Sequence, residues 1–383
     1  MNNIRLLTPI ILAVLASCGS NNTSEKWSEA DFKFSYTVDT VMVDAGEHFF
    51  FLNWGLSLSD VSKDRKYLYN LNPQDLLLEV VDLDNLKFKE AIKLEKEGPN
   101  GVGGGNISSM QVLDNGNIML YDFNTIFEIT PKGELVEKFD FDSKNLNGYD
   151  LGEMSRLSHR GLFTGDGKTY AAPISGNSYP VSSKGLGILD KVTKELQFVP
   201  LDMFADLDKF QIALEMEGGG TMSTGESFFS QFVENQLFIS NSAFNEVYVY
   251  DIEIDSLSHH TFNSQLTENA RILNFPTNVT TREALFDASG EKNKQIQFGP
   301  FISDPAKSLY WRFSSEGKDN GDDTFSNDYY LTFFDMEFNM LKEQKIENFR
   351  GMPETFIKDG MLYTFLNIED ELAFIRLKPI LEE

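Results

Sequence analysis

The feature that most constrains this chain is an internal repeat of short apolar strands. A turn followed by an apolar strand occurs six times, and another apolar stretch precedes each copy. The six copies occupy residues 64–69, 115–121, 166–170, 234–239, 306–311 and 359–364. Successive copies are 51, 51, 68, 72 and 53 residues apart when the turns are aligned on Arg65, Gly116, Gly167, Asn235, Lys307 and Gly360. Each copy predicts a tight β-hairpin, and the regular spacing indicates a repeat architecture.

A second hairpin follows the first within a repeat. It is an apolar strand that ends in Asp, a turn of about four residues and another strand. The residues at this position are Asp82, Asp190, Asp251 and Asp335. Such an Asp can accept hydrogen bonds from backbone N–H groups two residues further on and so fix the turn. The second repeat has Thr130-Pro-Lys-Gly133 in this place. We interpret the Asp residues as turn formers rather than metal ligands, because they do not converge on one point.

Two hairpins per repeat make a four-stranded antiparallel unit, so six units predict an all-β chain folded as a six-bladed β-propeller. The sixth copy runs through 372–377 and then lacks an outer strand. At the other end, 32–43 alternates like a strand and belongs to no hairpin. We expect this strand to pair with 372–377 and close the last blade, which also covers two strand edges. The predicted propeller domain spans 31–383.

The N-terminus is typical of a lipoprotein signal peptide over residues 1–17. Arg5 precedes eleven mostly apolar residues, too few to span a bilayer. Leu15-Ala-Ser-Cys18 resembles a lipobox, and Cys18 is the single cysteine of the chain. We expect lipidation at Cys18, a flexible tether over 18–30 and a place in the cell envelope. Gly19 favours the outer membrane, facing either the periplasm or the cell surface. The alternatives are an ordinary signal peptide and an apolar N-terminal strand.

The formal net charge of the chain is −26 at pH 7. Such a field repels phosphate backbones, so we expect no nucleic-acid partner. The shortage of Lys and Arg also argues against a second, electrostatic contact with a membrane. The expected membrane contact is therefore the lipid on Cys18.

The long connections are expected on one face. In a propeller, the crossings between blades and the loops between second and third strands lie on the same face. The long segments are 95–105, 142–155, 172–185, 202–226, 263–297 and 314–328. Loops of more than about 12 to 15 residues usually have a function, so this face is the predicted working surface. Apolar spacing also predicts a helix over 201–216, which would act as a lid or simply cover the fold.

Candidate ligand-binding cations occur in the third repeat. Arg156, His159 and Arg160 are predicted on its innermost strand, where a cation and an imidazole could meet an anionic ligand in the axial channel. The alternative is a surface or inter-blade histidine.

Oxygen-bearing candidates stand at the starts of other inner strands. Asn106, Glu226 and Glu354 could contribute to a ligand site or hold a calcium ion. The glycine-rich crossing 96–106 lacks the spacing of a phosphate-binding loop, and we interpret it as a turn. The acidic segment 318–323 lacks the spacing of a calcium loop. No catalytic set can be picked out, and calcium is the one cofactor considered.

The lipobox, the six repeats and the crossing Glu97-Gly-Pro-Asn-Gly-Val-Gly103 together resemble the six-bladed propeller lipoproteins of Gram-negative bacteria, within the broad TolB-like group. The resemblance covers residues 30–383, and it implies a fold rather than a reaction. We expect a non-enzymatic envelope lipoprotein that binds a small molecule, a glycan or an envelope protein on its long-loop face. The alternatives are a calcium-dependent enzyme of the lactonase or polysaccharide lyase type, and a scaffold of an outer-membrane complex.

Overall fold

The computed structural model describes residues 32–104, 106–122, 125–140, 145–176, 182–216, 219–321, 325–347, 349 and 354–382. These residues form a β-rich fold with two short helices, and most strands belong to four-stranded antiparallel sheets. The expected signal peptide, the lipidation site Cys18 and the tether lie outside the described residues. Among the described residues, no helix is both long and apolar enough to cross a membrane.

The larger sheets follow one another along the chain, and we number them in that order. The first sheet contains β3 (Ser59–Val61), β4 (Tyr67–Asn72), β5 (Leu77–Asp82) and β6 (Lys87–Lys93). The second contains β7 (Ser109–Val112), β8 (Ile118–Tyr121), β9 (Thr125–Ile129) and β10 (Leu135–Asp140). The third contains β11 (Asn147–Gly148), β12 (Ser155–Leu157), β13 (Leu162–Phe163), β14 (Thr169–Gly176), β15 (Ser183–Asp190) and β16 (Glu195–Pro200).

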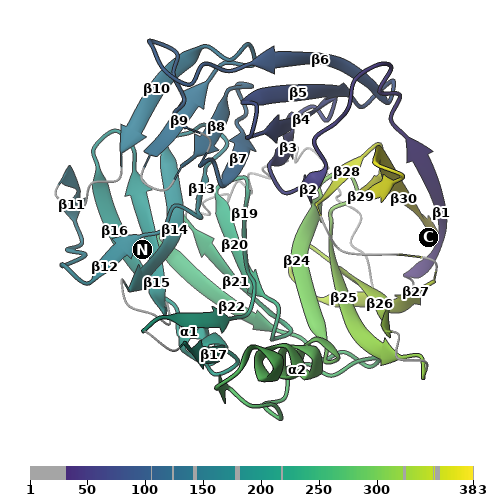
Figure 1. Cartoon of the computed structure of the whole chain (residues 1–383). Coiled ribbons are helices and arrows are strands. Elements are labelled where there is room, and N and C mark those ends of the chain that lie inside the picture. Colours follow the sequence, from purple (N-terminus) through teal and green to yellow (C-terminus); the bar gives the residue numbers. More distant parts are fainter. Residues whose placement is uncertain are drawn as a thin grey trace, which may run out of the picture.

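The remaining larger sheets use the second half of the chain and its first strand. The fourth contains β19 (Phe228–Val233), β20 (Gln236–Asn241), β21 (Glu246–Asp251) and β22 (Ser256–Thr261). The fifth contains β24 (Gln297–Asp304), β25 (Leu309–Asp319), β26 (Phe325–Phe334) and β27 (Met340–Ile346). The sixth contains β28 (Thr355–Lys358), β29 (Met361–Ile368), β30 (Glu371–Glu382) and β1 (Lys33–Met42). Figure 1 shows these sheets around a common centre in chain order.

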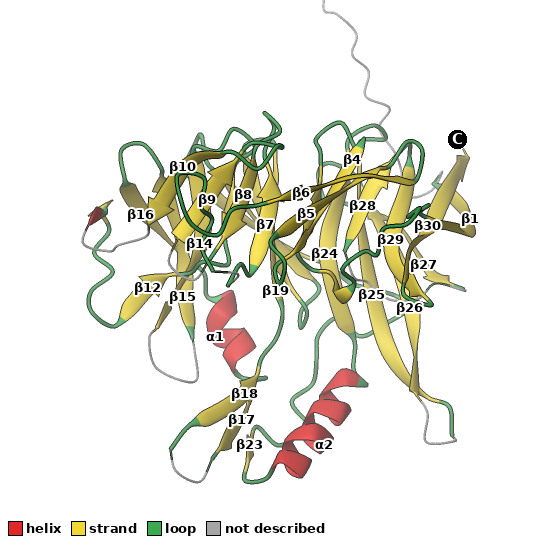
Figure 2. Cartoon of the chain, turned by 45° about the horizontal axis from the view of Figure 1, so that its top comes forward, coloured by secondary structure: helices red, strands yellow, loops and turns green. Residues whose placement is uncertain are grey.

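Two insertions add elements outside these sheets, the first between β16 and β19 and the second between β22 and β24. A small three-stranded sheet contains β17 (Ile212–Glu215), β18 (Thr221–Thr224) and β23 (Asn278–Val279). The helices are α1 (Met203–Asp208) and α2 (Arg282–Asn293), and β2 (Asn53–Leu56) precedes the first sheet. Figure 2 shows α1, α2 and the small sheet on one side of the larger sheets, and we call this the insertion side.

The turn chemistry predicted for the second hairpins is confirmed. The Asp82 carboxylate accepts hydrogen bonds from the backbone N–H groups of Asp84 and Asn85, both at 3.0 Å. The equivalent carboxylates of Asp190, Asp251 and Asp335 accept bonds from backbone N–H groups two to four residues further on. These residues are therefore turn formers.

The strand at the N-terminus pairs where the sequence predicts. β1 lies antiparallel to β30, with Lys33 opposite Glu382 and Met42 opposite Ala373. The guanidinium Nε of Arg376 on β30 donates to the carboxylate of Asp39 on β1 at 2.8 Å. Both ends of the described chain thus lie in one sheet.

Two of the predicted long loops are mainly strands, which corrects the sequence interpretation of 172–185 and 314–328. β14 continues to Gly176 and β15 starts at Ser183, while β25 and β26 pair out to Asp319 opposite Phe325. Polar residues pair well in a hairpin that projects beyond the core, because the ladder is made by the backbone. Part of 142–155 also forms a strand, since β11 pairs parallel to β16.

The helix predicted over 201–216 is wrong beyond Asp208. α1 has six residues, and β17 follows it and pairs with β18. Along β17 the residues Ile212 and Leu214 are buried, whereas Glu215 is exposed, which is the period of a strand. The apolar spacing that predicted one helix therefore combines a short helix with a strand.

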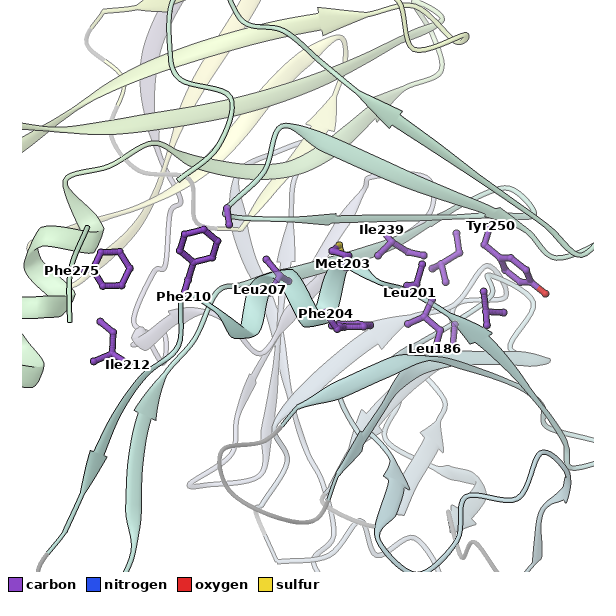
Figure 3. Packing of buried hydrophobic residues seen from close by; sticks show 14 of the residues in the cluster. Leu186, Leu201, Met203, Phe204, Leu207, Phe210, Ile212, Ile239, Tyr250 and Phe275 are labelled. Carbon is purple, nitrogen blue, oxygen red and sulfur yellow. The ribbon is translucent and has the colours of Figure 1, made fainter. Parts of the chain in front are cut away.

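α1 fills the space between the third and fourth sheets. Figure 3 shows Met203, Phe204 and Leu207 of this helix with Leu186 of the third sheet and Ile239 of the fourth. The same buried cluster extends through Phe210 and Ile212 to Phe275 in the second insertion. The helix is thus anchored by apolar packing, which favours the alternative that it covers the fold.

Candidate functional site

The candidate cations of the third repeat lie at an interruption of its inner edge. Arg156 belongs to β12, while His159 and Arg160 lie in the bend between β12 and β13. This corrects the prediction that they share one continuous inner strand. The chain approaches β14 so closely at Gly161 that a Cβ there would be 2.4 Å from the carbonyl oxygen of Ala171. Only glycine fits this position, and the strand breaks beside it.

A buried tyrosine fixes the shape of the bend. The Tyr170 hydroxyl donates to the carbonyl oxygen of Ser158 at 2.9 Å and accepts from the backbone N–H of Gly161 at 3.0 Å. Its ring lies 4.9 Å from the ring of Phe163 and 6.2 Å from the ring of Tyr121. Burial raises the pKa of Tyr170 far above its ordinary value, so the hydroxyl remains a donor at neutral pH. The bend is therefore held from the core.

The two guanidinium groups face solvent. Arg156 and Arg160 are both exposed, and within the described part of the chain neither side chain forms an ion pair or a hydrogen bond. His159 between them is half-buried. Burial, the charge of Arg160 and then the charge of Arg156 lower the pKa of His159, and Asp122 acts in the opposite direction. At neutral pH the segment thus presents two positive charges beside a mostly neutral imidazole. We call residues 156–160 the cationic segment.

The cationic segment lies at the junction of the second and third sheets, on the insertion side. Leu157 packs in the buried cluster that joins these two sheets. β12 pairs with the end of β14 from Ile174 to Gly176, and Figure 2 shows β12 on the same side as α1. Asp122 follows β8 of the second sheet directly.

Asn106 lies near the same end of the second sheet, and its side chain is exposed. The backbone N–H of Ser108, two residues after Asn106, donates to the carbonyl oxygen of Tyr121 at 2.8 Å, and Tyr121 directly precedes Asp122.

Glu354 lies elsewhere, beside Gly55 and directly before the sixth sheet. Burial raises the pKa of Glu354, while a hydrogen bond from the backbone N–H of Leu56 opposes this rise.

The side chain of Glu226 is buried, and its carboxylate is engaged inside the protein. Its Oε2 lies 3.2 Å from Nε of Arg271, and its Oε1 lies 3.3 Å from Nζ of Lys292. The hydroxyl of Ser242 donates to Oε2 at 2.6 Å. The three charged side chains are at most 5% exposed. Glu226 therefore joins the fourth sheet to the second insertion.

Sequence reasoning identified three members of the cationic segment but missed the residues that support it. Tyr170 carries no sequence signal of its own, since strand pairing brings its hydroxyl to the segment, and Asp122 belongs to the neighbouring sheet. The sequence suggests Glu226 as a ligand group because it stands at the start of an inner strand, and no motif marks its ion-pair partners Arg271 and Lys292. Among the described residues, no group of three or more His, Cys, Asp or Glu side chains could share a metal ion.

The family model of DUF4221, a domain of unknown function, matches residues 31–345. A crystal structure of a DUF4221 member from Bacteroides vulgatus ATCC 8482 has a TM-score of 0.63 at 14% identity, over 92% of this chain and 99% of that one. A candidate exported protein of Bacteroides fragilis NCTC 9343 has a TM-score of 0.51 at 11% identity, over 94% and 98%. At these identities the likeness concerns the fold alone. No curated protein matches the chain in sequence.

Proposed function

The chain belongs to the DUF4221 family, a domain of unknown function, and we propose that it is a lipid-anchored protein of the cell envelope that binds an anionic ligand on its insertion side. The observation that carries this proposal is the cationic segment. Two exposed arginines without an ion pair among the described residues stand beside a half-buried histidine, in a chain of net charge −26.

We propose that the scaffold for this site is a closed propeller of six blades. The pairing of β1 with β30 supports this arrangement, as do hydrogen bonds between consecutive sheets. The bonding pairs, from the first junction to the sixth, are Asp60 with Val112, Gln111 with Phe163, Gln197 with Asp255, Arg312 with Asn241, Lys307 with Gly360 and Lys358 with Asp84. The last of these pairs joins the sixth sheet to the first, as a closed ring requires.

The proposed anchor is the lipid on Cys18, after a signal peptide of residues 1–17 and before a tether of residues 18–30. The lipobox supports this assignment, and the likeness to a candidate exported protein agrees with a place outside the cytoplasm. Several acyl chains on one cysteine would hold the protein durably, because each buried methylene contributes about 0.8 kcal/mol. We propose the outer membrane as its location.

Short-range contacts decide whether an anion binds to so acidic a protein. At physiological ionic strength the screening length is about 8 Å, so distant carboxylates have little effect on a ligand at the surface. Arginine presents planar N–H donors that match carboxylate, sulfate and phosphate oxygens. Arg156 and Arg160 have these donors available without breaking an ion pair to a described residue. The cationic segment is thus suited to an anionic group.

The proposal is tested by titrating the full chain in detergent with inorganic sulfate and with citrate, and measuring the heat of binding. A charge-assisted hydrogen bond contributes about 1.5–3 kcal/mol, so Arg156→Ala and Arg160→Ala should each lower affinity about 10- to 100-fold. Lys132→Ala is the matched control, since Lys132 is exposed in a turn of the second sheet. Unchanged affinity in the double arginine variant would show that the anion site lies elsewhere.

A further inference from the structure

We propose that anion binding at the cationic segment is coupled to proton uptake by His159, of at most one proton per ligand, so that the site holds its ligand more tightly in acidic surroundings. This inference rests on the proposed function and adds a regulation to the same site.

The geometry places the histidine among charges of both signs. His159 is adjacent to Arg160 and three residues from Arg156, in a bend held by the hydroxyl of Tyr170. Asp122 directly follows β8, and it is the one described acid whose charge raises the pKa of His159. The imidazole is half-buried, so solvent screens these charges only in part.

The free protein disfavours a charge on this imidazole. Burial lowers the pKa of His159, and the two guanidiniums lower it further, while the single carboxylate of Asp122 raises it. An anion bound to Arg156 and Arg160 would cancel much of their repulsion and would itself attract an imidazolium. The pKa of His159 must therefore be higher in the complex than in the free protein.

Linkage fixes the sign of the effect. A ligand that raises the pKa of a group binds more tightly when that group is protonated, and the coupling is reciprocal. Because the free pKa lies below the ordinary histidine value of about 6.5, affinity should rise as the pH falls from neutral into the mildly acidic range. One proton can change the affinity by at most about tenfold per pH unit. Below the free pKa the gain is complete.

The experiment needs a probe whose own charge stays constant, and sulfate remains doubly charged over this range. The full chain in detergent is titrated with sulfate near pH 6.5, roughly the ordinary histidine pKa, in two buffers with different heats of ionisation. The difference between the two heats gives the number of protons taken up. We expect a measurable fraction of one proton per sulfate, together with an affinity that rises toward lower pH.

Two histidine variants separate this linkage from a general effect of pH. His159→Asn keeps a polar side chain that does not titrate, and should abolish the proton uptake and flatten the pH profile while sulfate still binds. His260→Asn is the matched control, because His260 lies on β22 of the fourth sheet, and should behave as the wild type.

The outcomes distinguish the two proposals. Sulfate binding that depends on both arginines but takes up no proton would overturn the linkage and leave the proposed function standing. Proton uptake that persists in His159→Asn would also overturn it, since another group would be titrating. A lack of sulfate binding at every pH would overturn the proposed function and the linkage together.

Discussion

At the scale of single residues, Glu226 balances two buried cations. Its carboxylate is the charged partner of both Arg271 and Lys292, and burial lowers the pKa of each of these basic groups. Glu226→Gln keeps the shape but removes the negative charge, which leaves two cations uncompensated inside the protein. We expect a loss of about 3–5 kcal/mol in the free energy of unfolding, measured by urea denaturation.

The control for this prediction is Glu253→Gln on the exposed turn of the fourth sheet. Its carboxylate accepts a hydrogen bond from the Asn235 amide in solvent, so its loss should change stability by no more than about 0.5 kcal/mol. An equal, small effect of both substitutions would mean that Glu226 does not compensate the two cations. Glu226→Gln should leave sulfate binding intact in folded protein, because the carboxylate points into the protein rather than toward a ligand.

At the scale of elements, the sequence predicts best where local chemistry alone sets the structure. The hairpins and the Asp turns depend on residues within a few positions of one another, and both were correctly placed. The sequence predicts one helix in place of α1 and β17 because Phe210 and Leu214 continue the apolar spacing of the helix. The sequence contains one signal for the missed helix α2, because Thr281 is a preferred N-cap residue directly before it. In the structure the Thr281 hydroxyl accepts a hydrogen bond from the backbone N–H of Ala284 at 3.1 Å.

The candidate site was predictable only in part, because only some of its residues are neighbours in the sequence. The three cationic candidates are neighbours in sequence, so a local pattern sufficed to find them. The charge of Asp122, which follows a strand of the second sheet, raises the pKa of His159 in the third sheet, and Arg271 follows Glu226 by 45 residues. Contacts of this kind are set by packing, which the spacing of residues along the chain does not encode.

The short helix α1 should matter for stability through its packing. Phe204 is buried, and its ring lies 5.3 Å from the ring of Phe228 in the fourth sheet. Phe204→Ala would leave a cavity between the third and fourth sheets, and we expect a loss of about 3–5 kcal/mol in urea denaturation. Asp206→Ala on the exposed face of the same helix should change stability by less than about 1 kcal/mol. Equal effects of the two variants would mean that the packing of α1 between the third and fourth sheets does not stabilise the fold.

At the scale of the whole molecule, the pairing of β1 with β30 makes the stability of the fold depend on the first and last strands of the described residues together. Thr37 and Lys378 are opposite one another in this pairing, and both are exposed. Opposite Cα atoms in antiparallel strands lie about 4.5–5.5 Å apart, within the range that a disulfide bridges. In a chain with Cys18→Ser, the pair Thr37→Cys and Lys378→Cys should therefore oxidise to an intramolecular disulfide.

The bond would close a loop that contains nearly the whole domain, which restricts the unfolded chain and should raise the free energy of unfolding by about 2–5 kcal/mol over the reduced form. Gel mobility without reductant and urea denaturation measure the two effects. The control pair, Ser35→Cys with Lys378→Cys, is out of register, because Ser35 lies opposite Ile380. Diagonal neighbours are about 7–8 Å apart, so this pair should oxidise poorly. Equal crosslinking of both pairs would mean that the two strands slide, and that β1 has no fixed register against β30.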